Sequence, residues 1–178
     1  MTARTRFMDW LTPLATPASE VNWEVMYTRE LPRIYNFFRY RVGDGAVAED
    51  LTSTTFEKAW RARNRYRRDA AAFSTWLFTI ARNVAADHFR HRRAEVPLEE
   101  IATKSAEGDT PEQSVLRCAD FERLSCLLAG LPARERELLA LKYGSDLSNR
   151  DIARVTGLSE SNVGTILHRT VLSLRTKW

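Results

Sequence analysis

Apolar residues recur at helical spacing along most of this chain, and no stretch shows the alternation of a strand. Near the start, an apolar residue appears every three or four positions, at Trp23, Tyr27, Leu31, Ile34 and Phe38. This is the period of one face of a helix. Glycine occurs 7 times and proline 6 times in 178 residues, so helix breaks are few. The pattern predicts an all-α protein.

Capping residues set the expected helix ends. Pro32 is expected to kink or split the first helix, and Gly43 with Asp44 to end it and cap the next. Ser74 or Thr75 is a candidate cap for the third helix. The later helices are expected over about 46–63, 75–93, 112–129, 132–143, 148–155 and 159 to near the C-terminus. Pro132 is expected to be the first residue of its helix, and Ser148 and Ser159 are expected to cap theirs.

Charge divides the chain into basic and acidic parts. Residues 1–93 hold 16 Lys and Arg against 10 Asp and Glu, whereas residues 94–113 hold 1 against 6, with Pro97, Gly108 and Pro111. Residues 114–178 are again basic, with 10 against 7. We therefore expect a loose arm over 1–19 and two small helical domains, 20–93 and 114–178, joined by a flexible acidic linker at 94–113. Basic lobes suit a polyanionic partner. The linker could equally be a plain tether.

The first domain carries aromatic and basic residues suited to single-stranded nucleic acid, which binds by stacking inside a basic groove. On the helix over 75–93, one face collects a tryptophan and a polar stripe. Phe73 shares the core face of Leu77 and Ile80, and Trp76 could be either core or a stacking residue. The candidate strand-binding residues are Tyr66, Arg67, Arg68, Trp76, Thr79, Asn83, Asp87, Arg90 and Arg93.

The last two predicted helices have the pattern of a helix-turn-helix, with Gly157 in the turn. Ile152 and Val155 are expected to pack against Val163 and Leu167 on one inward face. Short polar side chains near the start of a recognition helix suit base edges and phosphates in the major groove. The candidate duplex-binding residues on the opposite face are Ser159, Ser161, Asn162, Thr165, His168 and Arg169.

Nothing in the sequence points to an enzyme, a cofactor or a metal site. There is no phosphate-binding glycine loop, and His88 and His91 have no third ligand nearby in the sequence. Cys118 and Cys126 are expected to be reduced and packed as small apolar groups. The apolar runs are shorter than the roughly 20 residues of a membrane span, so we expect a cytoplasmic protein without membrane insertion.

Four ordered motifs resemble the extracytoplasmic-function group of bacterial sigma factors. They are A-E-D-L-T-x-x-x-F-x-K-A-W from Ala48, W-L-x-x-I-A-R-N-x-x-x-D from Trp76, L-P-x-x-x-R-E from Leu131 and D-I-A-x-x-x-G-L-S-x-x-x-V from Asp151. The resemblance covers about residues 20–178. It implies a two-domain subunit that directs RNA polymerase to promoters, with the first domain opening and reading the minus-ten element and the second reading the minus-thirty-five element.

The resemblance also implies protein partners. The helix around 50–60 would dock on the clamp of core RNA polymerase, and the last domain would sit on its flap. The linker would thread the active cleft. Control by an anti-sigma factor is expected as well. The residues implied for the clamp contact are Asp50, Leu51, Ser53, Thr54, Phe56 and Trp60.

Some positions differ from the usual family pattern. Ser53 and Thr54 stand where Gln and Glu are common, and Asn162, Gly164 and Ile166 replace Thr, Lys and Arg. Two other classes of protein share part of this pattern: a regulator that binds duplex DNA without polymerase, and a mimic that only sequesters an anti-sigma factor. The first would not need the basic aromatic surface, and the second should have a receiver domain or a degraded basic face.

Overall fold

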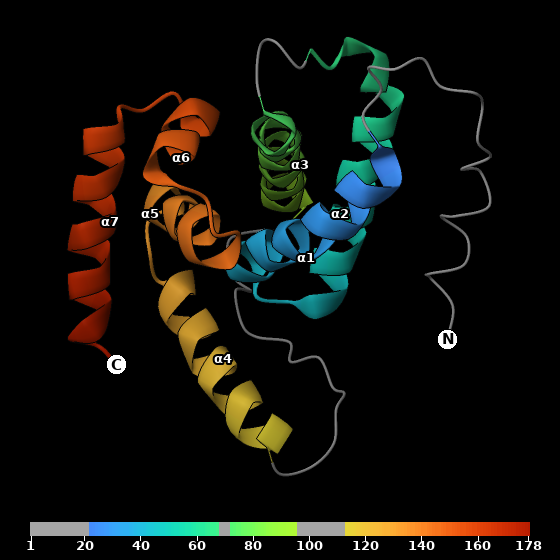
Figure 1. Cartoon of the computed structure of the whole chain (residues 1–178). Helices are drawn as coiled ribbons and strands as arrows, with labels where there is room; N and C mark the ends of the chain where they lie inside the picture. The colour runs from blue at the N-terminus through green and yellow to red at the C-terminus, as the bar shows by residue number, and fades with distance from the viewer. Residues whose placement is uncertain (1–21, 68–71, 96–112) are drawn as a thin grey trace.

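The computed structural model describes residues 22–67, 72–95 and 113–178, with the side chains of 93–95 and 113–119 outside that description. Within these residues the chain is helical and contains no strand, so the all-α prediction is confirmed. The N-terminal domain holds α1 to α3 and the C-terminal domain α4 to α7 (Figure 1). The elements are α1 Trp23–Val42, α2 Gly45–Arg61, a short 3₁₀ turn Arg63–Arg65, α3 Phe73–Glu95, α4 Gln113–Ala129, α5 Ala133–Leu139, a π turn Ala140–Gly144, α6 Asn149–Thr156 and α7 Glu160–Arg175.

The helix ends of the N-terminal domain follow from capping side chains. Asn22 accepts a hydrogen bond from the Val25 amide at the start of α1. Gly43 ends that helix with a left-handed backbone (φ 79°), a conformation that costs glycine little. The next residue, Asp44, accepts from the Val47 amide and caps α2, as predicted. Pro32 lies inside α1 without splitting it, because its exposed position lets the helix continue around it.

The core of the N-terminal domain is aromatic. Ile34, Phe37 and Phe38 of α1 are fully buried with Leu77 and Phe78 of α3. The ring of Phe37 meets that of Phe38 at 5.1 Å and that of Phe78 at 6.0 Å, both edge to face. Burying large rings supplies most of the stability of so small a core. The same packing fixes which face of α3 points outward.

In the C-terminal domain, α6 and α7 pack as predicted. Ile152 and Val155 of α6 are buried together with Val163 and Leu167 of α7. Ser148 caps α6 and Gly157 ends it with a left-handed backbone (φ 75°), so the chain turns directly into α7. These two helices therefore form one unit that presents the opposite face of α7 to solvent.

The two domains contact each other directly, which the sequence did not indicate. The π turn packs on α1, and α6 contacts α3; Figure 1 shows α6 beside α3. At the first contact the backbone of Gly144 comes so close that an added Cβ would lie 3.0 Å from the Asn36 carbonyl oxygen and 3.2 Å from the Tyr40 ring. Ser145 is buried there, and its hydroxyl donates to the carbonyl oxygens of Arg33 and Ala140.

Some predicted boundaries were wrong. Helix α3 begins at Phe73, two residues before the helix expected from 75, because Phe73 packs into an aromatic cluster; Ser74 and Thr75 therefore lie inside it and do not cap it. Pro132 is the cap residue of α5 and not its first helical residue, so this helix begins one residue later than expected, at Ala133. The N-terminal arm and nearly all of the acidic linker lie outside the described residues.

Candidate nucleic-acid interfaces

A cluster of aromatic rings joins the three helices of the N-terminal domain at one end. The Trp23 ring lies 5.5 Å from Trp60, 5.3 Å from Phe73 and 6.2 Å from Trp76, all edge to face. Tyr66 lies 5.5 Å from Phe73 and 5.1 Å from Trp76. Rings at these separations attract one another beyond the effect of burial alone. The cluster fixes where α3 begins relative to α1 and α2.

The burial of each ring in this cluster bears on whether it is a core residue or a candidate stacking residue. Phe73 is buried and belongs to the core, as its helix face indicated. Trp76 and Tyr66 are half-buried, and each has ring partners within the cluster. Both rings therefore come preorganised at the edge of the domain. Arg67 beside them is exposed, whereas Arg68 lies outside the described residues.

The polar stripe of α3 continues from Trp76 along the outer surface. Thr79, Asn83 and Arg90 are exposed and Asp87 is half-buried. The Asp87 carboxylate pairs with Lys58 of α2 at 3.4 Å and with Arg90 at 3.2 Å. Asp87 therefore restrains two cations beside Asn83. The side chain of Arg93, also predicted for this surface, is outside the described set.

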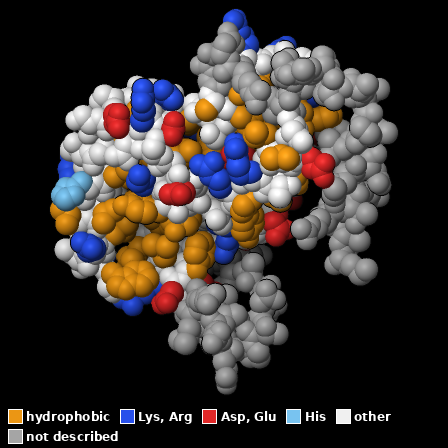
Figure 2. Space-filling model, in the orientation of Figure 1, with side chains coloured by type: hydrophobic (Ala, Val, Ile, Leu, Met, Phe, Trp, Pro, Cys, Tyr) orange, Lys and Arg blue, Asp and Glu red, His pale blue; other side chains and the backbone are white. Residues whose placement is uncertain are grey.

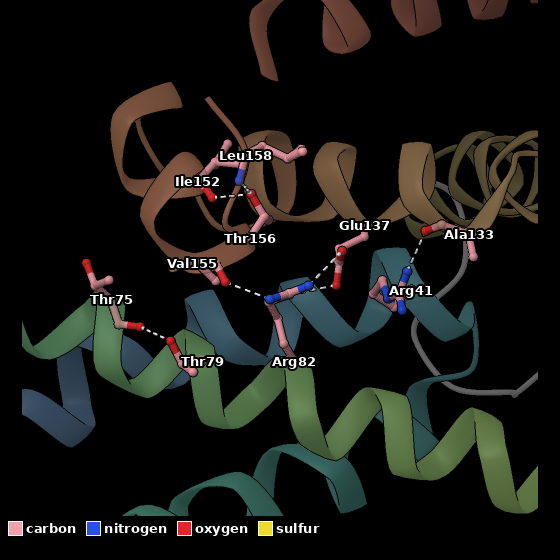
Figure 3. Close-up of polar contacts among 10 residues, drawn as sticks. All are labelled: Arg41, Thr75, Thr79, Arg82, Ala133, Glu137, Ile152, Val155, Thr156 and Leu158. Carbon is pink, nitrogen blue, oxygen red and sulfur yellow. Dashed lines mark hydrogen bonds and ion pairs between the residues drawn. The ribbon is translucent and has the colours of Figure 1, made fainter. Parts of the chain in front are cut away.

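Arg82 is the basic residue of α3 that leaves this surface. It turns to the C-terminal domain, where its guanidinium pairs with Glu137 and donates to the Val155 carbonyl oxygen (Figure 3). On the helical wheel of α3, Arg82 lies between the core face and the polar stripe, so the sequence alone allows it to point toward either one.

The predicted polymerase-docking residues of α2 fall into three groups. Asp50 and Ser53 are exposed and Thr54 is half-buried. Leu51 (8% exposed) and Phe56 (4%) belong instead to the core, because they lie on the face of α2 that packs against α1. Those two residues hold the helix and do not form its outer surface. Trp60 is half-buried in the aromatic cluster with the Arg63 guanidinium over its ring at 4.3 Å.

The predicted duplex-binding residues share one exposed face of α7. Ser159 caps the helix by accepting from the Asn162 amide at 3.2 Å, as expected. Thr165 donates to the carbonyl oxygen of Ser161, one turn earlier. All six predicted residues are exposed: Ser159, Ser161, Asn162, Thr165, His168 and Arg169. The helix start and this polar face are thus available together.

An apolar groove lies on the other side of α7. Figure 2 shows hydrophobic side chains gathered around a hollow where the C-terminal part of α7 approaches α4 in Figure 1. The groove has a volume of about 290 Å³. It is lined by residues of α1, α4, α5, the π turn and the end of α7, among them Tyr40, Leu124, Tyr143, Val171, Leu174 and Trp178. Because it faces away from Thr165, a partner in the groove would leave the polar face open.

Several expectations concern groups without a nucleic-acid role. No cluster of metal-ligating side chains occurs among the described residues. The His91 ring lies 2.7 Å from the Asp87 carbonyl oxygen. Cys126 is a free thiol but is exposed, so the expectation that it packs in the interior was wrong; its position on the outer side of α4 explains this. The side chain of Cys118 is not described. None of the described helices is long and apolar enough to cross a membrane.

Comparison with known families accounts for both domains. The model of sigma-70 region 2 matches residues 26–95, and that of sigma-70 region 4 matches residues 121–174. The RNA polymerase sigma factor CarQ of Myxococcus xanthus is 34% identical over 157 residues, which are 86% of this chain and 87% of CarQ. The chain therefore belongs to the sigma-70 family of RNA polymerase sigma factors.

Within that family it belongs to the extracytoplasmic-function group. A relative named for that group, the sigma factor BldN of Streptomyces coelicolor, is 35% identical over 151 residues. These are 84% of this chain but 57% of BldN, so the chain spans little more than half of that relative.

Solved structures of sigma factors share the fold. The sigma factor RpoE, in complex with the anti-sigma factor NepR from Bartonella quintana, matches with a TM-score of 0.67 and 24% identity over 87% of this chain and 95% of that one. CnrH, in complex with the cytosolic domain of CnrY, matches with a TM-score of 0.62 and 23% identity over 86% and 85%.

Proposed function

We propose that this chain binds core RNA polymerase and directs promoter-specific initiation, with its N-terminal domain opening and reading the minus-ten element and its C-terminal domain reading the minus-thirty-five element. In this proposal the domains are 20–93 and 114–178, joined by the acidic linker 94–113, and the protein acts in the cytoplasm. The observation that carries it is the presence in one chain of two different exposed surfaces. One has rings beside a polar stripe, and the other is a capped helix with a polar face.

The α3 surface fits a separated strand. Trp76 and Tyr66 offer ring surfaces for bases, at about 1–3 kcal/mol per stacked base. Asn83 can accept and donate hydrogen bonds to a base edge, while Arg67 and Arg90 can neutralise phosphates. Because the aromatic cluster holds both rings in place, little ordering is required on binding.

The α7 surface fits duplex DNA. Its first turn offers free amides and the positive end of the helix dipole to a phosphate. Thr165 and Asn162 can read base edges in the major groove, and Arg169 can bind a base or a phosphate. Gly164 and Ile166 add no cation, so the electrostatic share of this contact is modest.

Polymerase would be held at two places. The exposed residues of α2, with Asp50 and Ser53 at their centre, would bind the clamp. The apolar groove of the C-terminal domain would seat the flap, because it lies opposite the DNA face and can be filled while α7 stays on the promoter. An anti-sigma factor is the expected inhibitor.

Run-off transcription tests this function. Purified core polymerase, with and without the chain, is supplied with a library of promoters. The proposal predicts initiation at a defined subset only when the chain is present, and weak promoter binding by the chain alone. Tight binding of duplex by the free chain, with no effect on polymerase, would instead indicate a regulator that works without it.

A further inference from the structure

Arg82 is held by two residues of the other domain, Glu137 and Val155, and this contact is called the clasp below. Its Nε lies 2.9 Å from Glu137 Oε1, its Nη2 3.4 Å from Glu137 Oε2, and its Nη1 2.6 Å from the Val155 carbonyl oxygen (Figure 3). The Arg82 side chain is 29% exposed and that of Glu137 15%. A guanidinium facing two carboxylate oxygens is the same fork that arginine offers to a phosphate. Glu137 thus occupies the place that a phosphate could take.

Every described partner of Arg82 belongs to the C-terminal domain. On α3, Arg82 directly precedes Asn83 and is three residues after Thr79, both of which are exposed on the predicted strand-binding stripe. Separation of the domains would remove Glu137 and Val155 together. The guanidinium would then be a free cation on the flank of that stripe.

The clasp is one part of a wider contact that closes the domains on each other. Arg41 donates from Nη1 to the Ala133 carbonyl oxygen at 2.8 Å, and Arg33 from Nε to the Ser145 carbonyl oxygen at 2.9 Å. The Gly144 backbone fits against α1 without room for a side chain. The closed arrangement therefore has shape and polar complementarity at several points.

Reading two promoter elements at once is incompatible with this arrangement. Elements centred about 25 base pairs apart are separated by about 85 Å along B-DNA. In the closed chain α3 touches α6, and α6 touches α7, so α3 and α7 lie within about two helix diameters, roughly 20 Å. If the proposed function holds, the domains must separate on the promoter.

We propose that Arg82 is a phosphate-binding residue of the minus-ten surface. Its pairing with Glu137 keeps it from nucleic acid while the domains are in contact, and domain separation transfers it from Glu137 to the nucleic-acid backbone. This inference rests on the proposed function. Promoter binding then includes the release of the Arg82 guanidinium from Glu137. The free chain thereby has a weaker affinity for nucleic acid than its N-terminal surface alone would give.

The test measures binding of the full chain to a fluorescein-labelled 15-nucleotide oligo(dT) by anisotropy, over a series of salt concentrations. A phosphate contact is independent of sequence, so oligo(dT) is a sufficient probe. Glu137→Gln weakens the clasp while keeping the shape of the side chain. Glu135→Gln, on the same helix, is the matched control for the change in charge.

Glu137→Gln is expected to bind about tenfold more tightly than wild type, if the Arg82 contact raises affinity by about tenfold and only about one wild-type molecule in a hundred is open. Its salt slope should steepen by about 0.7, the value for one phosphate contact on a single strand. Adding Arg82→Gln should remove both gains, whereas Arg82→Gln alone should change little in the closed chain. Equal binding by Glu137→Gln and Glu135→Gln, or an equal loss from Arg82→Gln in both backgrounds, would overturn the inference.

A second variant reaches the open state by another route. Gly144→Leu places a side chain against the Asn36 carbonyl oxygen and should separate the domains with Arg82 and Glu137 unchanged. It should reproduce the tighter binding and steeper slope, and it decides the matter if circular dichroism finds Glu137→Gln unfolded. No gain in Gly144→Leu, with its helical signal intact, would refute the inference.

Run-off transcription by wild type with core polymerase separates the two proposals. A chain that initiates at promoters but shows none of the Arg82 effects contradicts the clasp alone. A chain that does not support initiation contradicts the proposed function itself.

Discussion

Trp23 is the ring by which α1 joins the aromatic cluster, and its truncation gives a quantitative test. Its ring makes edge-to-face contacts with Trp60, Phe73 and Trp76. Each such pair contributes about 0.5–1.5 kcal/mol beyond burial. Trp23 is half-buried, so the loss on Trp23→Ala should lie at the lower end of the 3–5 kcal/mol typical of tryptophan truncation in a core. We expect about 3 kcal/mol.

Urea unfolding of the full chain, followed by circular dichroism at 222 nm, measures this loss without relying on tryptophan fluorescence. Trp23→Phe is the control: it keeps a ring in the cluster and should cost about 1 kcal/mol. A double-mutant cycle between Trp23→Ala and Trp76→Ala should give a coupling of about 0.5–1.5 kcal/mol. A loss below about 1 kcal/mol for Trp23→Ala, with no coupling to Trp76, would refute the view that the cluster positions the start of α3.

Three further predictions follow from single contacts. Asp44→Ala removes the side chain that caps α2 and should cost about 1 kcal/mol in urea unfolding, while Asp44→Asn should stay near wild type; equal losses would exclude the cap as the cause. Burial, with smaller contributions from Arg92 and His91, lowers the pKa of His88, so the unfolded chain binds that proton more readily and stability should fall as the pH drops below about 6.5. Between pH 7.5 and 5.5 the melting temperature of wild type should therefore fall further than that of His88→Gln, and parallel curves would contradict this. Arg169→Ala should weaken duplex binding at all sequences and flatten the salt slope by about 0.9 if it contacts a phosphate, whereas an unchanged slope with altered promoter choice would make it a base contact.

Helix periodicity and capping residues predicted most of the fold. The spacing of apolar residues located α1, α2, α6 and α7, and Asp44, Ser148 and Ser159 cap helices as predicted. These features are local, so a single sequence contains the information for them. The errors at Phe73 and Pro132 are shifts of one or two residues at helix ends. At Phe73 the cause is tertiary, because ring packing extends α3 beyond its apparent cap.

Features that depend on the pairing of distant segments could not be predicted. The contact between Arg82 and Glu137 joins residues 55 positions apart. No sequence pattern around either residue predicts the other as its partner. The same holds for Gly144 against α1. Within α2, the resemblance included Leu51 and Phe56 in the clamp contact, whereas both are buried in the core, as their apolar spacing on the helix would indicate. The exposed polar residues of α7 were predicted correctly because an amphipathic helix has one inward face.

Permanganate footprinting of promoter complexes tests the central claim most directly, since it detects unpaired thymines. With core polymerase and the wild-type chain, reactive thymines should appear around the minus-ten element of a promoter that gives run-off transcripts. Asn83→Ala should lose that reactivity while retaining binding to core and its circular dichroism spectrum. Full reactivity with Asn83→Ala, or no reactive thymines with wild type on a promoter it binds, would contradict the account.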